Sequence, residues 1–372
     1  MCTKIKYGVV GVGIIGRVHV DVAAKLKETE LVAIADVNIA NAKAVAEKYH
    51  VRWYQNYVEM LEKEKLDAIS ICTPHNLHYP IAMKALEYNT HVLVEKPMAL
   101  SVKEADEMIA KARRLDLKLG VVFQHRTKPL SISIKRLIEE GKLGELYRAL
   151  LEYCTYRDQR YYRSGPWRGT WKGEGGGVLI NQAIHFIDLF QWFIGKKPSR
   201  LAAFINTLTH EIEVEDLASA VIEFEGGTQG VIHVSSFDMP SFARFDIRGD
   251  NGIIVVEDNR GRIAWNKPPI KESIISSLKE RAKPIVKWED ILPSHIKESG
   301  HQMVIKDFAL AIINDQEPMV NGEEGRKSLE IVNAIILSGI KNKIVKFPVD
   351  RHEYEKLLTE LSELKHIPQK VF

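Results

Sequence analysis

The chain has 372 residues, of which 45% are apolar and 27% charged, a balance typical of a soluble globular protein and unlike that of disordered or membrane-spanning chains. The formal net charge is only +3 and the basic residues form no block, which argues against nucleic acid as a partner. At this length we expect two domains, because one hydrophobic core seldom serves so many residues.

The cysteines and the N-terminus bear on the cellular compartment. Cys2, Cys72 and Cys154 are scattered, with the spacing of neither a disulfide framework nor a metal site. Several glycines between residues 8 and 16 would break a signal-peptide helix. Apolar runs stay well short of the roughly 18 residues that a membrane span needs. We therefore expect a soluble, cytoplasmic protein that has no membrane partner.

From residue 5 to about 124, short apolar runs alternate with stretches of helical period, which is typical of βαβ units. Their near-continuous apolar character suits strands covered by helices on both faces. This predicts a doubly wound parallel sheet over a first domain of residues 1–124. The six expected strands are Ile5–Val10, Leu31–Ala35, Arg52–Tyr54, Ala68–Cys72, Val92–Val94 and Leu119–Phe123.

A glycine-rich turn directly follows the first of these strands. Gly11, Gly13 and Gly16 open the next helix, where glycines permit a tight turn and close approach of the backbone to a pyrophosphate. Asp36 ends the second strand 20 residues after Gly16, where a carboxylate would bind the adenosine ribose. A valine and an asparagine follow it, rather than an arginine for a 2′-phosphate, which favours NAD over NADP. The glycines alone leave a flavin or a methylated donor open.

The regular alternation of apolar runs and helical stretches ends after residue 124, and we expect a second domain over residues 125–372. A helix is predicted at 132–140, a strand at 147–156, a long loop at 157–177 and an apolar helix at 178–194. Further runs of strand composition at 201–206, 218–224, 229–237 and 242–256, with turn signals at 225–227 and 249–252, predict an open, predominantly antiparallel sheet. Residues 266–300 read as an irregular insertion, followed by helices at 302–313 and 325–340.

A metal site is not expected from the sequence. His75 and His78 form a pair at metal-ligand spacing, but no cluster of carboxylates or cysteines completes a site.

Several short motifs follow one another along the chain, and their order helps to identify the type of protein. Thr73-Pro74 and His78 follow the fourth strand, and Glu95-Lys96-Pro97 follow the fifth. Downstream come Trp167-Arg168, the triplet Gly175–Gly177, and then Asn181, His185 and Asp188. With these residues the chain resembles the Gfo/Idh/MocA family of oxidoreductases over nearly its whole length. The resemblance implies an N-terminal Rossmann domain, a C-terminal domain with a mostly antiparallel sheet, and NAD as the cofactor.

The resemblance also implies roles for individual residues. Lys96 and His185 would be catalytic: the lysine polarises a substrate oxygen, and the histidine takes the alcohol proton as hydride leaves. Arg163 and Asn181 would join them in binding the substrate. The expected cofactor-binding residues are Gly11, Gly13, Ile14, Ile15, Gly16, Asp36, Thr73, Pro74, His78, Glu95, Lys96, Gln124, Trp167 and Arg168.

Asn181 stands where many family members have an aspartate four residues before the histidine. An amide cannot stabilise an imidazolium by charge, so either Lys96 or His185 is left to carry the proton. The asparagine, with Trp171-Lys172-Gly173 nearby, also resembles the branch that oxidises the 3-hydroxyl of UDP-N-acetylglucosaminuronate. Arginines at 157, 160, 163 and 168 would suit such a charged nucleotide sugar, although a solvated loop explains them too.

Three functions remain open from the sequence. The first is an NAD-dependent dehydrogenase acting on a secondary hydroxyl of a sugar, cyclic polyol or nucleotide sugar. The second is an NAD-dependent, redox-neutral glycosidase, and the third a non-catalytic dinucleotide sensor, against which the presence of Lys96 and His185 argues. The family parallel further implies a homodimer or homotetramer, formed through a face of the second sheet.

Overall fold

The computed structural model describes residues 4–277, 284–296 and 298–363. Contacts divide the chain into two compact units, each described by itself below. Unit 1 comprises residues 1–127, 172–175 and 298–329, and unit 2 comprises residues 128–171, 176–297 and 330–372. Cys2 and the start of the N-terminal segment lie outside the described residues, whereas Cys72 and Cys154 are buried free thiols. Within the described ranges, no helix is both long and apolar enough to cross a membrane.

Unit 1 is built on a parallel sheet whose strand order is β3-β2-β1-β4-β5-β6. All six predicted strands are present, each within two residues of its expected ends, and the predicted Rossmann-like architecture is confirmed. The strand order reverses between β1 and β4, which is the place where open α/β sheets bind ligands. The strands are β1 (Ile5–Val10), β2 (Thr29–Ala35), β3 (Arg52–Tyr54), β4 (Ala68–Ile71), β5 (His91–Val94) and β6 (Leu119–Val121).

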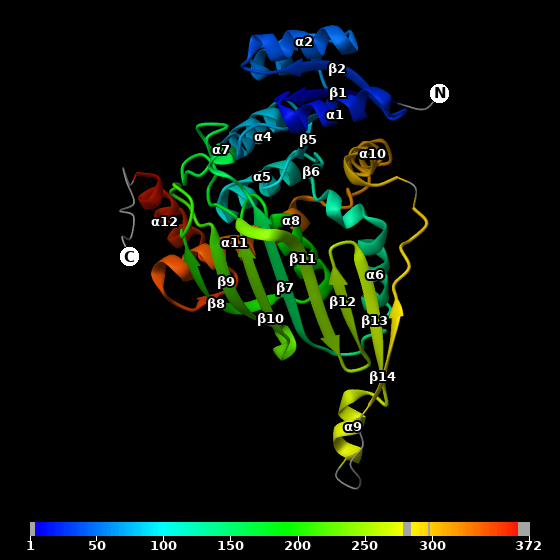
Figure 1. Cartoon of the computed structure of the whole chain (residues 1–372). Helices are drawn as coiled ribbons and strands as arrows, with labels where there is room; N and C mark the ends of the chain where they lie inside the picture. Colours follow the sequence, from blue (N-terminus) through cyan, green and yellow to red (C-terminus); the bar gives the residue numbers. More distant parts are fainter. Residues whose placement is uncertain (1–3, 278–283, 297, 364–372) are drawn as a thin grey trace. The chain divides into compact units, whose positions relative to one another are not determined.

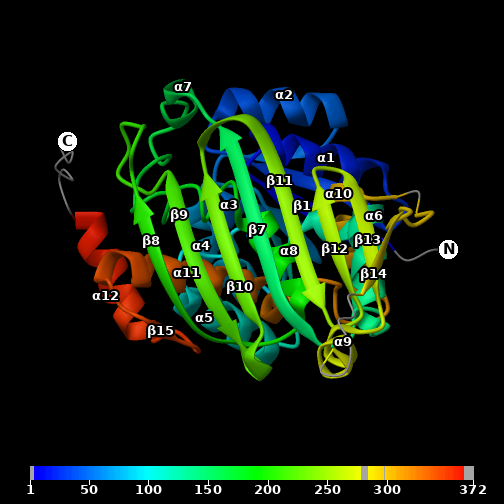
Figure 2. The same cartoon turned by 60° about the horizontal axis from the view of Figure 1, so that its bottom comes forward.

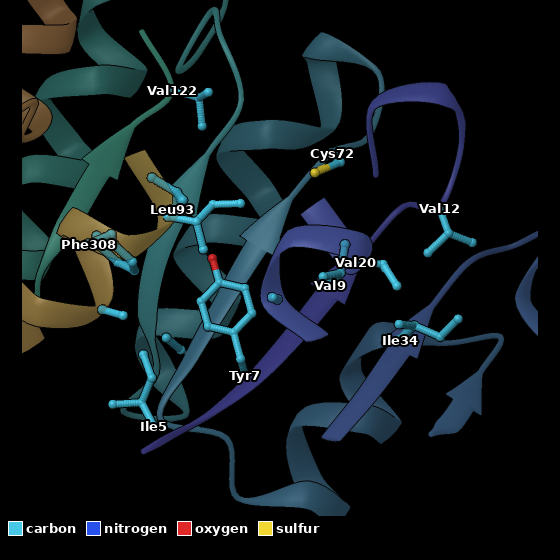
Figure 3. Packing of buried hydrophobic residues seen from close by; sticks show 14 of the residues in the cluster. Ile5, Tyr7, Val9, Val12, Val20, Ile34, Cys72, Leu93, Val122 and Phe308 are labelled. Atoms are coloured by element: carbon cyan, nitrogen blue, oxygen red, sulfur yellow. The ribbon is translucent and has the colours of Figure 1, made fainter. Parts of the chain in front are cut away.

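The helices of unit 1 cover this sheet and share its core. Tyr7 and Val9 of β1 pack with Val20 of α1, while Leu93 of β5 and Phe308 of α10 belong to the same buried cluster (Figure 3). Because α10 contributes to this core, residues 298–329 belong to unit 1, which a single boundary at residue 124 does not include. The helices are α1 (Ile14–Lys25), α2 (Ile39–Tyr49), α3 (Tyr57–Glu64), η1 (His75–Leu77), α4 (His78–Glu87), α5 (Val102–Arg114), η2 (Gln124–Thr127) and α10 (Gly300–Ile313).

Unit 2 holds a nine-stranded sheet of order β14-β13-β12-β11-β7-β10-β9-β8-β15 (Figures 1 and 2). Every neighbouring pair in it is antiparallel except β7 and β10, so the predicted open, predominantly antiparallel sheet is confirmed. The strands are β7 (Leu146–Tyr156), β8 (Pro198–Asn206), β9 (Leu217–Phe224), β10 (Gln229–Ser235), β11 (Phe237–Gly249), β12 (Gly252–Glu257), β13 (Arg260–Lys267), β14 (Ile285–Asp290) and β15 (Val345–Lys346).

One face of this sheet is packed against helices. Phe186 of α8 stacks on Tyr153 of β7 with ring centroids 4.1 Å apart. Figure 2 views the sheet from the opposite face. The strand register places Phe204 of β8, Val221 of β9 and Val231 of β10 on that face, and all three side chains are exposed. The helices are α6 (Pro129–Glu139), α7 (Gln159–Tyr162), α8 (Ile184–Ile194), η3 (Glu225–Gly227), α9 (Ile270–Ser276), α11 (Gly322–Lys341, whose residues up to Leu329 belong to unit 1) and α12 (Arg351–Glu363).

The run 242–256 is divided between β11 and β12 at the predicted turn of residues 249–252, where the chain reverses. The interpretation of residues 266–300 as irregular was wrong: the segment includes α9 and β14, and β14 pairs antiparallel with β13. Residues 278–283 and 297 of that segment lie outside the described residues.

The apolar helix predicted at 178–194 begins only at Ile184. Glu215 explains the delay: its carboxylate accepts the backbone N–H groups of Gly177 and Leu179, and its carbonyl accepts that of Val178. With these amides held elsewhere, residues 178–183 form turns. Asn181 therefore precedes the helix that carries His185 instead of sitting on its face.

Candidate active site

The glycine turn of unit 1 joins β1 to α1, and its three glycines differ in backbone conformation and in the space around them. Gly11 has a φ of +85°, which side chains disfavour. A Cβ on Gly16 would lie 1.8 Å from the carbonyl oxygen of Gly11, so only glycine fits. A Cβ on Gly13 would meet no atom within 4 Å, and no side chain caps α1 at Gly13. The turn thus leaves space and uncapped amides at a helix N-terminus, as a pyrophosphate requires.

Asp36 follows β2 and lies against this turn. Its Oδ2 atom accepts the N–H of Val12 at 2.8 Å, and its Oδ1 atom accepts that of Asn38 at 2.8 Å. These bonds fix a half-buried carboxylate beside the glycines. Of the two isoleucines that open α1, Ile14 is 93% exposed and Ile15 packs against the core.

The segment after β4 holds three of the expected cofactor-binding residues. Among the described residues, the buried Oγ1 atom of Thr73 makes no hydrogen bond, and Pro74 beside it is half-buried. His78 is fully buried, with Nδ1 2.7 Å from the carbonyl oxygen of Pro97 and Nε2 2.9 Å from that of Thr73. Burial lowers the pKa of His78 and favours its neutral form. This histidine ties together the loops after β4 and β5.

Glu95 and Lys96 directly follow β5. The buried Glu95 carboxylate lies 3.0 Å from Nε2 of His19 and 3.4 Å from Nε2 of His301. Burial opposes its ionisation, but these imidazoles hold the pKa of Glu95 well below its usual range. Lys96 is half-buried and its backbone N–H donates to Oε2 of Glu95 at 3.2 Å. Gln124, also half-buried, opens η2 after β6.

These residues follow the carboxyl ends of β1, β2, β4, β5 and β6, which is one edge of a parallel sheet. The open space at Gly13, the uncapped end of α1, the Asp36 carboxylate and the unpartnered Thr73 hydroxyl all fit a dinucleotide. Unit 1 therefore has the features of a cofactor site.

In unit 2, the hydroxyl of Tyr161 is the centre of a polar cluster. It receives hydrogen bonds from Arg168 at 2.6 Å, from the amide of Asn181 at 3.0 Å and from the amide of Gln182 at 3.2 Å. The guanidinium carbon of Arg168 lies 4.4 Å from the ring centroids of both Tyr161 and Trp167. Asn181 and Gln182 are buried. This Tyr161 cluster collects donors of the kind that bind carboxylates and sugar hydroxyls.

The other predicted residues of unit 2, His185, Asp188 and Arg163, differ in burial. His185 is the second residue of α8 and half-buried, and Asp188 lies fully buried one turn further on. Arg163 instead reaches Glu211 at 2.8 Å, in an ion pair whose side chains are 70% and 67% exposed. The structure brings Asn181 and Arg168 together at Tyr161, places Trp167 against Arg168, and pairs Arg163 with Glu211 instead.

The glycine triplet at 175–177 has a structural role. A Cβ on Gly177 would lie 1.8 Å from the carbonyl oxygen of Glu215. Gly175 and Gly176 have φ values of +80° and +152°. The triplet thus permits the turn that leads to Asn181.

Sequence reasoning missed three residues that the structure makes prominent. His19 lies three residues after Gly16 on α1, a spacing that was visible but carried no expectation. Tyr161 lies in a stretch where the sequence analysis considered only the arginines. Nothing in the sequence connects His301 with Glu95, because their contact depends on the packing of α10.

Comparison with known proteins gives consistent results. Residues 5–123 match the oxidoreductase family with an NAD-binding Rossmann fold, and residues 132–255 match the Gfo/Idh/MocA C-terminal domain. Myo-inositol 2-dehydrogenase of Thermotoga maritima is 24% identical over 330 residues, 87% of this chain and 93% of the relative. D-glucoside 3-dehydrogenase of Escherichia coli is 32% identical over 198 residues, 52% of this chain and 55% of the relative.

Among solved structures, the WlbA dehydrogenase from Bordetella pertussis, crystallised with NADH and UDP-GlcNAcA, is similar with a TM-score of 0.80 and 28% identity. That match covers 93% of this chain and 100% of the WlbA chain.

Proposed function

The chain belongs to the Gfo/Idh/MocA family of oxidoreductases, and from this premise we propose that it oxidises the 3-hydroxyl of a UDP-linked N-acetylhexosaminuronate. At the coarser level it is an NAD-dependent dehydrogenase that acts on the CH–OH groups of sugars or polyols. The proposal concerns the substrate and the residues that act on it.

We assign the chemistry to Lys96 and His185. Oxidation of a secondary alcohol removes a hydride from carbon and a proton from oxygen, and bound NAD supplies the hydride acceptor. The Lys96 ammonium donates a hydrogen bond to the reacting oxygen and stabilises the negative charge that develops on it. His185, whose intrinsic pKa suits proton transfer near neutral pH, accepts the hydroxyl proton.

The Tyr161 cluster is the observation that carries the substrate proposal. Its Arg168 guanidinium presents donors in the fork that carboxylates and phosphates accept. The amides of Asn181 and Gln182 suit sugar hydroxyls and an N-acetyl group. The likeness to the WlbA dehydrogenase, crystallised with UDP-GlcNAcA, supports the same substrate class.

A simple glucoside is the second candidate substrate. It is favoured by the match to D-glucoside 3-dehydrogenase, which is 32% identical over about half of each chain. The two candidates differ in the group carried at the anomeric carbon. They also differ in the 6-carboxylate, for which an uncharged glucoside has no counterpart.

The test is NADH formation, followed by near-ultraviolet absorbance, with NAD and a panel containing UDP-N-acetylglucosaminuronate, UDP-N-acetylglucosamine, methyl glucoside and myo-inositol. The proposal predicts the highest kcat/KM for UDP-N-acetylglucosaminuronate. A higher value for methyl glucoside would replace it with the second candidate. Release of aglycone from an aryl glycoside without net NADH would identify a redox-neutral glycosidase instead.

We also propose that copies of this chain associate through the open face of the unit 2 sheet, where Phe204, Val221 and Val231 are exposed. The measurement is the molar mass in solution. It should be two or four times 42.3 kDa in the wild type and fall in a Phe204→Glu variant. A monomeric wild type would contradict the assignment.

A further inference from the structure

Three side chains of unit 1 from distant parts of the sequence meet in a small cluster. His19 comes from α1, Glu95 from the end of β5, and His301 from the first turn of α10. One nitrogen of each imidazole and one oxygen of the carboxylate all lie within 4.8 Å of one another. We propose that this His19–Glu95–His301 cluster binds a divalent transition-metal ion, and that zinc is the ion its donor set favours.

The donor geometry supports a single shared ion. Nε2 of His19 and Nε2 of His301 approach the same oxygen of Glu95, at 3.0 and 3.4 Å. Zinc bonds to nitrogen and carboxylate oxygen are about 2.0–2.2 Å long, so two donors on one tetrahedral ion are about 3.4 Å apart. The two imidazole rings are inclined by 65°, with centroids 5.5 Å apart, so they approach the carboxylate from different directions.

The surroundings of the cluster suit a metal as well. His19 is fully buried, and its other ring nitrogen, Nδ1, is 2.8 Å from the hydroxyl of Ser70. The Ser70 hydroxyl is in turn 2.6 Å from that of Tyr7. Metal-bound histidines usually have such a partner on the second nitrogen, because it fixes the tautomer and the ring orientation. In the metal-bound form Nδ1 of His19 would donate to Ser70, which leaves the lone pair of Nε2 for the ion.

His301 supplies an independent observation. Its Nε2 atom is buried, yet it makes no hydrogen bond in the described structure, and its distance of 3.4 Å from Glu95 is long for one. A buried polar atom left without a partner costs free energy, and a metal bond would satisfy it. The His301 side chain is 17% exposed, whereas those of His19 and Glu95 are 0% and 7% exposed, so access to the cluster is from the His301 side.

Two histidines and one glutamate are also the donor set of several zinc enzymes, which keep their fourth position for water. Here the ion would tie α10 to α1 and β5, and the hydride transfer proposed above does not pass through it. The inference is independent of the substrate, since metal content is measured without turnover.

The test uses the full chain, stripped with a chelator and then dialysed against Zn²⁺ or Co²⁺. We expect about one ion per chain by elemental analysis, and visible absorption from the Co²⁺ form typical of a four-coordinate site. Zn²⁺ should also raise the Tm, because a ligand that binds only the folded state stabilises it. Less than about a tenth of an ion per chain, at a concentration where one-site binding would saturate, would overturn the proposal and leave a purely hydrogen-bonded cluster.

Variants locate the ion. His301→Gln removes a ligand at a partly exposed position and should lose the bound metal and the Zn²⁺-dependent rise in Tm. His301→Cys supplies a thiolate ligand and should restore binding, which separates ligation from folding. His295→Gln, at an exposed histidine outside the cluster, is the matched control and should bind as the wild type does. Unchanged metal binding by His301→Gln would place the ion elsewhere and overturn the proposal.

Discussion

The side-chain amide of Asn181 donates a hydrogen bond of 3.0 Å to the hydroxyl of Tyr161. Arg168 and Gln182 donate to the same oxygen, so one phenol organises three side chains from two separate segments. The asparagine that departs from the usual family pattern is therefore an integral part of the Tyr161 cluster.

Tyr161→Phe should lower kcat/KM for the sugar by about 10- to 100-fold, because the three donors lose their common acceptor and their orientation. The buried Asn181 and Gln182 amides each lose this acceptor, which should cost about 1–3 kcal/mol of stability. Steady-state kinetics and thermal melts measure the two effects. Tyr156→Phe, at a tyrosine that is 50% exposed on β7, is the matched control. Equal kinetics for both variants would remove the Tyr161 cluster from substrate binding.

Lys96→Ala should abolish detectable turnover while NAD affinity changes by less than about tenfold, or roughly 1.4 kcal/mol. The reason is that the ammonium acts on the reacting oxygen rather than on the dinucleotide. Lys103→Ala, at an exposed lysine on α5, should behave as the wild type. NAD titration and initial rates test this pair, and normal turnover in Lys96→Ala would remove the lysine from the mechanism.

Alanine at two glycines of the turn should separate folding from cofactor binding. Gly13→Ala places its methyl group in open space, so the free energy of unfolding should fall by less than about 1 kcal/mol, or 2–4 °C in Tm. The methyl group occupies the space where we expect the pyrophosphate, so NAD affinity should fall at least about tenfold. Gly16→Ala sets a methyl group against the Gly11 carbonyl and should cost about 3 kcal/mol. Unimpaired NAD binding by Gly13→Ala would refute the assignment of the turn.

The buried pair of His210 and Asp216 predicts a pH dependence of stability. Burial alone would raise the pKa of Asp216, but hydrogen bonds from His210, Leu208 and Thr209 outweigh it and lower that pKa. Burial alone would lower the pKa of His210, but its bonds to Asp216 and the Arg157 carbonyl raise it. The Asp216 contribution is therefore lost as the pH falls through its folded pKa, and the His210 contribution as the pH rises through its folded pKa.

His210→Gln tests the loss of the His210 contribution at high pH. The stability lost in the variant should be larger, by about 1 kcal/mol, below the unfolded histidine pKa of about 6.5 than well above the folded value. Denaturant unfolding at pH 5.5 and 9 measures the difference. His352→Gln, at an exposed histidine, is the matched control. A larger loss at pH 9 than at pH 5.5 would contradict the sign of the pKa shift.

The sequence predicted the six strands of unit 1 well because their signals are local. Buried parallel strands such as Ala68–Ile71 read as continuous apolar runs, and the spacing from Gly16 to Asp36 follows from a single βαβ unit. Both patterns can be recognised without knowing what packs against them.

What the sequence missed depends on contacts between distant segments. The start of α8 is set by Glu215, more than 30 residues further along the chain, which takes the amides of Gly177 and Leu179. Strand β14 is exposed along its length and has little apolar periodicity, so it is recognisable only by its pairing with β13. His301 likewise could not be linked to Glu95 from the sequence, because their contact depends on the packing of α10.

The most direct test of the proposed chemistry follows the hydride itself. UDP-N-acetylglucosaminuronate carrying deuterium at C3 is incubated with the protein and NAD, and the reduced nucleotide is analysed by mass spectrometry. Our account predicts that the NADH formed carries the deuterium. Unlabelled NADH, or no reduced nucleotide from this sugar, would contradict it.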